Sequence, residues 1–209
     1  MTIKHQKMKK QLSLLAALLL TITSLSFAQN ADAEVKKIVK NFRDPKNVAL
    51  SFTYQYVIDD NDNQEAQKGE AYFQGESYKI IMKEQQTISD GKTIWTYLVD
   101  DGECMVSDAS EGNNNTPLKL LTTLDKEYTS EHKPGGIIEL TNPKGEFKKV
   151  ILRSDLKRYD LLAGIDVFAD DGSKLVINFL ETKTNQELGK DFFTFDEKAY
   201  PNVEIIDMR

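Results

Sequence analysis

Apolar residues recur at every second position along much of the chain after residue 50, which places them on one face of a β-strand. In residues 50–58, Leu50, Phe52 and Tyr54 fall on one side, and mostly polar residues alternate with them. This segment predicts a half-buried strand with a large aromatic face. The same period predicts further strands at residues 69–74, 78–82, 86–89, 93–99, 104–107, 136–140, 147–153, 159–169, 175–182, 192–195 and 203–206.

Short turn sequences separate these segments and indicate hairpins. Asp90-Gly91, Asp101-Gly102 and Asp171-Gly172 are turns by residue type, because glycine accepts the positive φ of tight hairpins. A further polar turn is expected at residues 59–63. Strands follow one another with no alternating helices, so the pattern excludes a parallel α/β sheet. It predicts a mainly β fold, as a curved antiparallel sheet or open barrel with a helix laid on it.

Two short helices interrupt the strand pattern. Residues 32–42 are expected to begin at Asp32 and end before Pro45, with apolar side chains three and four positions apart at Val35, Ile38, Val39 and Phe42. Residues 116–124 form the second predicted helix. Thr116 could cap it, Pro117 suits its first turn, and Leu118, Leu121 and Leu124 line one side.

The first 28 residues resemble a cleavable export signal. Four lysines precede the apolar run at residues 12–20, and Ser26-Phe27-Ala28 ends the segment with small residues at the positions a signal peptidase reads. The apolar run is too short for a membrane span of ~20 residues. We therefore expect cleavage after Ala28, export to the periplasm, and a single domain over residues 29–209. The cleavage site has no cysteine to carry a lipid.

Removal of this segment makes the chain more acidic. It leaves 23 Lys and Arg against 33 Asp and Glu, a net charge of −10, whereas the full chain carries −6. Nucleic acid is therefore not an expected partner, because phosphate backbones are bound through clustered basic residues. Cys104 is the single cysteine, so no disulfide can form within the chain, and we expect a buried thiol.

Catalytic chemistry has little support in the sequence. Without His5 of the signal, the one histidine is His132, predicted to lie in an exposed polar loop at residues 130–134. A histidine triad or histidine-rich zinc site is therefore not supported. The acidic residues 59–65 lack the glycine that an EF-hand loop requires at its sixth position, which favours a solvated hairpin tip. Pairs of acids of the glycosidase kind stay open, but none stands out. We predict no enzyme, metal site or cofactor.

Aromatic side chains are numerous and carry the remaining signal. They include Phe52, Tyr54, Trp95 and Tyr97 on the predicted strands. Such residues can fill an ordinary core, or they can line an apolar cavity inside a curved sheet. Both arrangements need the same inward face, so periodicity alone leaves the choice open.

One segment resembles a known family. Residues 89–97 read Ser-Asp-Gly-Lys-Thr-Ile-Trp-Thr-Tyr, which closely resembles the signature hairpin of the LolA family of periplasmic lipoprotein carriers. Other similar segments follow in the family's order: Gly69-Glu70-Ala71-Tyr72, Tyr78, Asn115-Thr116-Pro117-Leu118, Phe193-Thr194-Phe195 and residues 201–207. The resemblance covers nearly all of residues 29–209.

The resemblance implies an incomplete antiparallel β-barrel whose open side is covered by short helices. Its cavity would hold the acyl chains of lipoproteins, received from an inner-membrane ABC transporter and passed to an outer-membrane acceptor, by a soluble monomer with no lipid anchor. The two predicted helices would be its lid. The residues expected to line the cavity are Leu50, Phe52, Tyr54, Phe73, Tyr78, Ile80, Met82, Trp95, Tyr97, Leu118, Leu121 and Phe179.

The sequence departs from the family at one step. Well-studied members have a Lys-Arg-Pro step whose arginine latches the lid, whereas the matching stretch here is Phe73-Gln74-Gly75-Glu76. The resemblance therefore implies an acyl-chain ligand but not this latch. Two alternatives stay open: a general lipid-binding protein, and a LolA-like sensor or regulatory module of the envelope.

Overall fold

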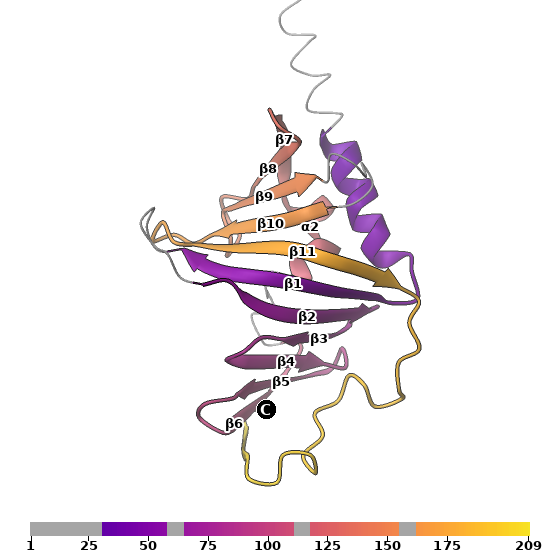
Figure 1. Ribbon diagram of the computed structural model, residues 1–209, viewed down its shortest axis with the longest axis vertical. Coiled ribbons are helices and arrows are strands. Elements are labelled where there is room, and N and C mark those ends of the chain that lie inside the picture. Colours follow the sequence, from indigo (N-terminus) through magenta and orange to yellow (C-terminus); the bar gives the residue numbers. More distant parts are fainter. Residues whose placement is uncertain (1–30, 58–64, 111–117, 155–161) are drawn as a thin grey trace, which may run out of the picture.

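A computed structural model describes residues 31–57, 65–110, 118–154 and 162–209 (Figure 1). Within these ranges, twelve strands form one sheet in the order β12-β6-β5-β4-β3-β2-β1-β11-β10-β9-β8-β7. The strands are β1 (Val48–Val57), β2 (Gln67–Gln74), β3 (Ser77–Ile81), β4 (Gln85–Ser89), β5 (Thr93–Leu98), β6 (Glu103–Asp108), β7 (Thr129–Lys133), β8 (Ile137–Thr141), β9 (Lys149–Ser154), β10 (Leu162–Phe168), β11 (Lys174–Thr184) and β12 (Glu204–Asp207).

Two meanders of strands meet at the centre of the sheet. β1 pairs with β2 on one side and with β11 on the other, all antiparallel. β1 to β6 lead outward to the neighbour of the edge strand β12, and β7 to β11 lead back from the opposite edge (Figure 1). The hairpin turns predicted at Gly91, Gly102 and Gly172 are confirmed, since each of these glycines has a positive φ. The mainly β, curved and open sheet predicted from the sequence is therefore confirmed.

One pair of strands departs from the antiparallel expectation. β12 pairs with β6 in parallel, with Ile205 opposite Cys104. The chain reaches this edge after β11 by crossing the sheet through residues 185–203 (Figure 1). The strand predicted at residues 192–195 is wrong, because this segment is a series of turns within the crossing. The sheet is consequently mixed.

A second correction concerns the segment that contains His132. It was predicted as an exposed loop, but it is β7, an edge strand paired with β8 so that His132 lies opposite Ile138. All five residues of β7 are polar, so the strand has no apolar alternation for a sequence pattern to detect. Hydrogen bonding to β8 decides its conformation instead.

The helices agree with the prediction in part. The N-terminal helix spans residues 31–43, close to the predicted 32–42. The predicted helix at 116–124 is wrong in form. Its described part is a 3-10 helix, η1 (Lys119–Thr122), followed by a one-turn helix, α2 (Leu124–Glu127). Its predicted start at Thr116 and Pro117 lies outside the described residues, as do the signal segment and the turn at 59–63.

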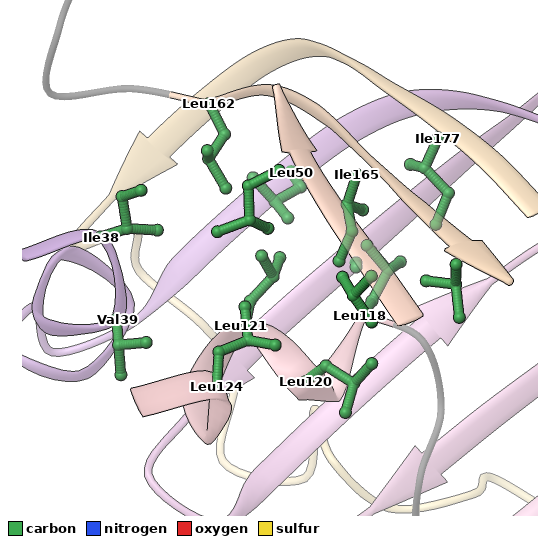
Figure 2. Packing of buried hydrophobic residues seen from close by; sticks show 14 of the residues in the cluster. Ile38, Val39, Leu50, Leu118, Leu120, Leu121, Leu124, Leu162, Ile165 and Ile177 are labelled. Atoms are coloured by element: carbon green, nitrogen blue, oxygen red, sulfur yellow. The ribbon is translucent and has the colours of Figure 1, made fainter. Parts of the chain in front are cut away.

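The main core lies on the face of the sheet that carries Leu50, Phe52 and Tyr54, here called the inner face. Val35, Ile38 and Val39 of the N-terminal helix pack onto it, as do leucines of η1 and α2. Figure 2 shows Leu118, Leu121 and Leu124 gathered between that helix and the strands. The N-terminal helix, η1 and α2 together therefore cover the inner face.

The opposite, outer face has a smaller cluster under the crossing segment. Phe195 packs with Ile88, Tyr97 and the fully buried Cys104. Its ring stacks on Tyr200 at 5.1 Å between centroids, and both rings contact Tyr97. The buried position predicted for Cys104 is confirmed, and burial raises the pKa of its thiol to about 11. This thiol is therefore a packing group at neutral pH.

Candidate functional site

The inner face encloses a cavity of about 410 Å³, here called the Tyr54 cavity. This volume lies within the range of roughly 300–1,000 Å³ typical of small-molecule sites. Its buried lining is almost entirely apolar: Phe52, Tyr54, Ile80, Leu118, Leu175 and Ile177, with Thr87 the one polar member. These residues come from β1, β3, β4, β11 and the start of the η1 segment. The cavity therefore lies between the sheet and its helical cover.

Polar side chains line the exposed part of the same cavity. The Tyr54 hydroxyl donates a hydrogen bond to Glu84 Oε2 at 2.7 Å and accepts one from the backbone N–H of Lys83 at 3.0 Å. Burial, with Glu84 beside it, raises the pKa of Tyr54 to about 12. The phenol is neutral at physiological pH and holds the Glu84 carboxylate in place at the edge of the cavity.

A second cavity of about 340 Å³ lies under the C-terminal half of the N-terminal helix. Ile38 and Phe42 of the helix face Leu162 and Phe179 of the sheet across it. The helix thus rests on its apolar stripe while leaving space beneath one end. A segment with fewer packing contacts opens at a lower free-energy cost than a filled core.

A charged contact joins the helix to the η1–α2 segment, here called the Arg43 clasp. Arg43 Nε donates to the carbonyl oxygen of Thr122 at 2.8 Å, and its Nη2 lies 2.7 Å from Asp125 Oδ1. The Asp125 side chain is 15% exposed and that of Arg43 36%. A planar guanidinium can hold a carbonyl and a carboxylate together in this way, whereas an ammonium cannot do so with the same geometry.

Separate contacts hold the start of the same helix against the sheet. The Ser130 hydroxyl donates to Asp32, and the Ser154 hydroxyl donates to Glu34 at 3.3 Å. His132 Nε2 lies 3.5 Å from the other oxygen of Glu34. Acidic residues in a first turn are also favoured by the helix dipole. The helix is therefore tied at both ends, to β7 and β9 at its start and to η1–α2 at its end.

The predicted cavity residues divide between the two faces. One cluster on the inner face contains Leu50, Phe52, Tyr54, Phe73, Tyr78, Ile80, Met82, Leu118, Leu121 and Phe179. Five of them line the Tyr54 cavity, namely Phe52, Tyr54, Ile80, Met82 and Leu118. Phe179 lines the second cavity. Ligand contact by any of them stays a prediction.

The prediction placed Trp95 and Tyr97 on the wrong face. Ile80 of β3 pairs with Thr87 of β4, and Thr87 pairs with Thr96 of β5, so all three side chains lie on the inner face. Trp95 and Tyr97 flank Thr96, so they point outward and belong to the smaller outer cluster. Both faces of this part of the sheet are covered, so the alternation along the strand gave no sign of which face was inner.

Sequence reasoning missed several cavity residues. Leu175 and Ile177 were on a predicted strand with the correct period, so their alternation could have indicated them. Glu65, Gln67 and Glu84 had no such signal, because exposed polar residues at strand ends are common. They lie together because the end of β1, the start of β2 and the end of β3 meet at the same edge of the cavity.

Within the described ranges, no group of three or more His, Cys, Asp or Glu residues could hold a metal ion. The described helices include none that is long and apolar enough to cross a membrane. The site's distinctive feature is therefore an apolar cavity with a polar edge.

Known proteins are similar to this chain in sequence and in fold. The family described as outer membrane lipoprotein carrier protein LolA matches residues 48–196, from β1 to the crossing segment. The chain belongs to the LolA family. The match spans strands β1 to β11, the η1–α2 segment and every residue that lines the Tyr54 cavity. The N-terminal helix, which supplies one side of the second cavity and Arg43 of the clasp, precedes it.

LolA relatives match over most of their own lengths. The outer-membrane lipoprotein carrier protein of Haemophilus ducreyi is 25% identical over 207 residues, which cover 91% of this chain and 94% of that protein. The protein of the same name from Histophilus somni strain 129Pt is 28% identical over 200 residues, with 90% and 93% covered. An uncharacterized conserved protein of Thermus thermophilus has a similar solved structure, with a TM-score of 0.52 at 12% identity, covering 84% of this chain and 97% of that one. This last likeness concerns the fold alone.

Proposed function

We propose that this protein is a periplasmic carrier that binds the acyl chains of lipoproteins in the Tyr54 cavity and moves them from the inner to the outer membrane. The observation that carries the proposal is the apolar cavity of about 410 Å³ between the sheet and a helical cover. Membership of the LolA family and relatives named as lipoprotein carriers support it.

Burial of acyl chains supplies enough free energy for such a role without a chemical reaction. Each methylene group removed from water contributes about 0.8 kcal/mol, so eight of them contribute about 6 kcal/mol. Phe52, Ile80 and Ile177 offer the chains an apolar surface of this kind. A carrier of this kind needs no catalytic group.

Loading and release require the cover to move. The N-terminal helix is held by a few polar contacts at each end and leaves a second cavity beneath it. A cover held in this way can open locally while the sheet stays folded. An inner-membrane ABC transporter as donor and an outer-membrane acceptor belong to the proposal.

The proposal is tested by the lipid content of the protein. Protein purified from the periplasm should release acylated peptides on extraction with organic solvent, as detected by mass spectrometry. The emptied protein should then bind a fluorescent acyl probe with saturable, 1:1 stoichiometry. Absence of both extracted lipid and probe binding would overturn the carrier function. Recovery of one signalling protein in place of acylated peptides would instead favour a sensor module.

A further inference from the structure

His132 faces the helical cover from the edge strand β7. It pairs with Ile138 of β8, which pairs with Leu152 of β9, and both of these apolar side chains are fully buried on the inner face. The His132 side chain therefore points to the inner face as well, where the start of the N-terminal helix lies beside β7 (Figure 1). Its Nε2 atom lies 3.5 Å from Oε2 of Glu34.

The Nε2 atom of His132 is buried and has no hydrogen-bond partner among the described residues. Buried polar atoms are nearly always paired in folded proteins, so an unpaired one requires an explanation. A neutral imidazole has a single N–H, whereas the protonated ring carries an N–H on both nitrogens and a positive charge. The contact with Glu34 is therefore an ion pair only when His132 is protonated.

The acidic groups around His132 favour its charged form. Asp32 and Glu34 lie in the first turn of the helix, where they accept hydrogen bonds from the hydroxyls of Ser130 and Ser154. The N-terminus of a helix carries about half a positive charge, and two carboxylates outweigh it. The side chains of His132 and Glu34 are only 25% and 29% exposed. Salt therefore screens their interaction less than that of a fully exposed pair.

The basic residues near this contact lie elsewhere. Lys133 is on the outer side of β7, where its ammonium group lies 2.9 Å from Glu131 and 3.8 Å from Glu139. Lys36 and Lys37 of the helix are exposed. The side chains that β8 and β9 present to His132 are apolar. Within the described ranges, His132 is therefore the base positioned to pair with Glu34.

We propose that the contact between His132 and Glu34 is a pH-sensitive switch, which holds the N-terminal helix more firmly on the sheet when His132 is protonated. Histidine changes its charge between about pH 8 and pH 5. The Arg43 clasp at the other end of the helix keeps its charge over this range, because a guanidinium stays protonated. Acidification thus tightens one end of the cover alone. This inference goes beyond the proposed carrier function and does not rest on it, because it concerns the closure of the cover in the empty protein.

Hydrogen exchange of the purified protein, without added ligand, tests the switch. Exchange of single amides should be followed by NMR at about pH 5.5 and about pH 7.5 and expressed as protection factors, which remove the intrinsic effect of pH on exchange. We expect the protection of residues 35–38 to be about threefold higher at the lower pH. Residues 41–43, next to the Arg43 clasp, should change by less than about 1.5-fold.

Variants then assign the effect to this contact. His132→Gln and Glu34→Gln each remove one partner, and each should abolish the dependence of protection on pH. Glu131→Gln is the matched control, because it removes a carboxylate from the same strand on the side of Lys133. This control should keep the full effect. Circular dichroism of each variant reports whether the fold is intact.

Several outcomes would overturn the switch. They are equal or lower protection of residues 35–38 at the lower pH in the wild-type protein, and loss of the effect in Glu131→Gln. Persistence of the effect in His132→Gln or in Glu34→Gln would also overturn it. Where one of these two variants fails to fold, the other decides, because the two changes lie on different elements.

Discussion

At the scale of single residues, Gly69 of β2 shows how closely the inner face is packed. A Cβ atom at this position would lie 2.5 Å from Cζ of Phe52 and 2.9 Å from the carbonyl oxygen of Ile81. The missing side chain lets the Phe52 ring approach the strand closely at one wall of the Tyr54 cavity. An aromatic ring over a strand glycine of this kind compensates for the weak strand preference of glycine.

Gly69→Ala should therefore destabilise the protein by about 1–3 kcal/mol, because the Phe52 ring must leave its position. Urea unfolding followed by far-UV circular dichroism measures the loss. Gly189→Ala is the matched control, since nothing lies within 4 Å of the added atom. Equal stability of the two variants would show that the Phe52 ring has room to move.

Buried and half-buried tyrosines give a second prediction at this scale. Burial raises the pKa values of Tyr54, Tyr72, Tyr78 and Tyr128 to about 12 from a usual value of 10.0. In the unfolded chain these phenols lose their protons first as the pH rises. The free energy of unfolding should therefore fall between about pH 10 and pH 12.

Absorbance of tyrosinate at 295 nm measures this titration, with circular dichroism in the same samples reporting the fold. The folded protein should ionise a fraction of its tyrosines only near pH 12. Tyr54→Phe should remove one phenol from this late fraction. Ionisation of every tyrosine in one step near pH 10, with the fold intact, would contradict the prediction.

At the scale of elements, strands were predictable where one face is apolar. β1 alternates buried and less buried residues from Val48 to Tyr54, and its period was visible in the sequence. β7 has no apolar face, and it is a strand because it pairs with β8. Residues 192–195 are rich in aromatic side chains, which suggested a strand, but they cover the outer face as turns. The ring centroids of Phe192 and Tyr72 lie 4.8 Å apart there. The spacing of apolar residues therefore predicts which side chains are buried, while contacts between distant segments determine whether a segment forms a strand.

The Arg43 clasp is an element-scale contact that the sequence could not reveal. Arg43 and Asp125 are 82 positions apart, and no motif joins them. The resemblance to LolA pointed to a different stretch for a latching arginine, at residues 73–76. The structure instead places an arginine at the end of the N-terminal helix, where it reaches both Thr122 and Asp125.

Arg43→Met should loosen the cover while leaving the sheet intact. Methionine keeps part of the apolar stem of arginine and removes its donors, so the global free energy of unfolding should fall by only about 1 kcal/mol. Hydrogen exchange should become faster in η1, α2 and the end of the N-terminal helix. Lys40→Met is the control, because its ion pair with Asp44 is highly exposed. Exchange unchanged by Arg43→Met would contradict the role of the clasp.

At the scale of the whole molecule, the proposed carrier function implies that the cover and an acyl chain compete for the inner face. Leu118 and Leu121 are buried against the sheet (Figure 2). Leu118 also lines the Tyr54 cavity. An acyl chain that extends along the inner face beyond the cavity must displace such side chains. On this proposal, part of the stability of the empty protein is lost on loading and is replaced by contacts with the chain.

Leu121→Ala tests this competition, because Leu121 is fully buried between the cover and the sheet. Removal of its side chain should lower the free energy of unfolding by about 2–5 kcal/mol. Affinity for a fluorescent acyl probe should stay equal or rise, because the bound chain no longer has to displace a leucine. Saturating probe should then restore much of the lost stability, since a ligand stabilises the state that binds it.

Leu180→Ala is the matched control, since this leucine is 60% exposed and should change neither stability nor binding. Urea unfolding with and without probe gives both quantities from the same protein. A tenfold loss of affinity in Leu121→Ala would show that Leu121 contacts the bound chain instead of blocking it. In that case the cover would be part of the binding surface, and loading would add to the core that Figure 2 shows without replacing any of it.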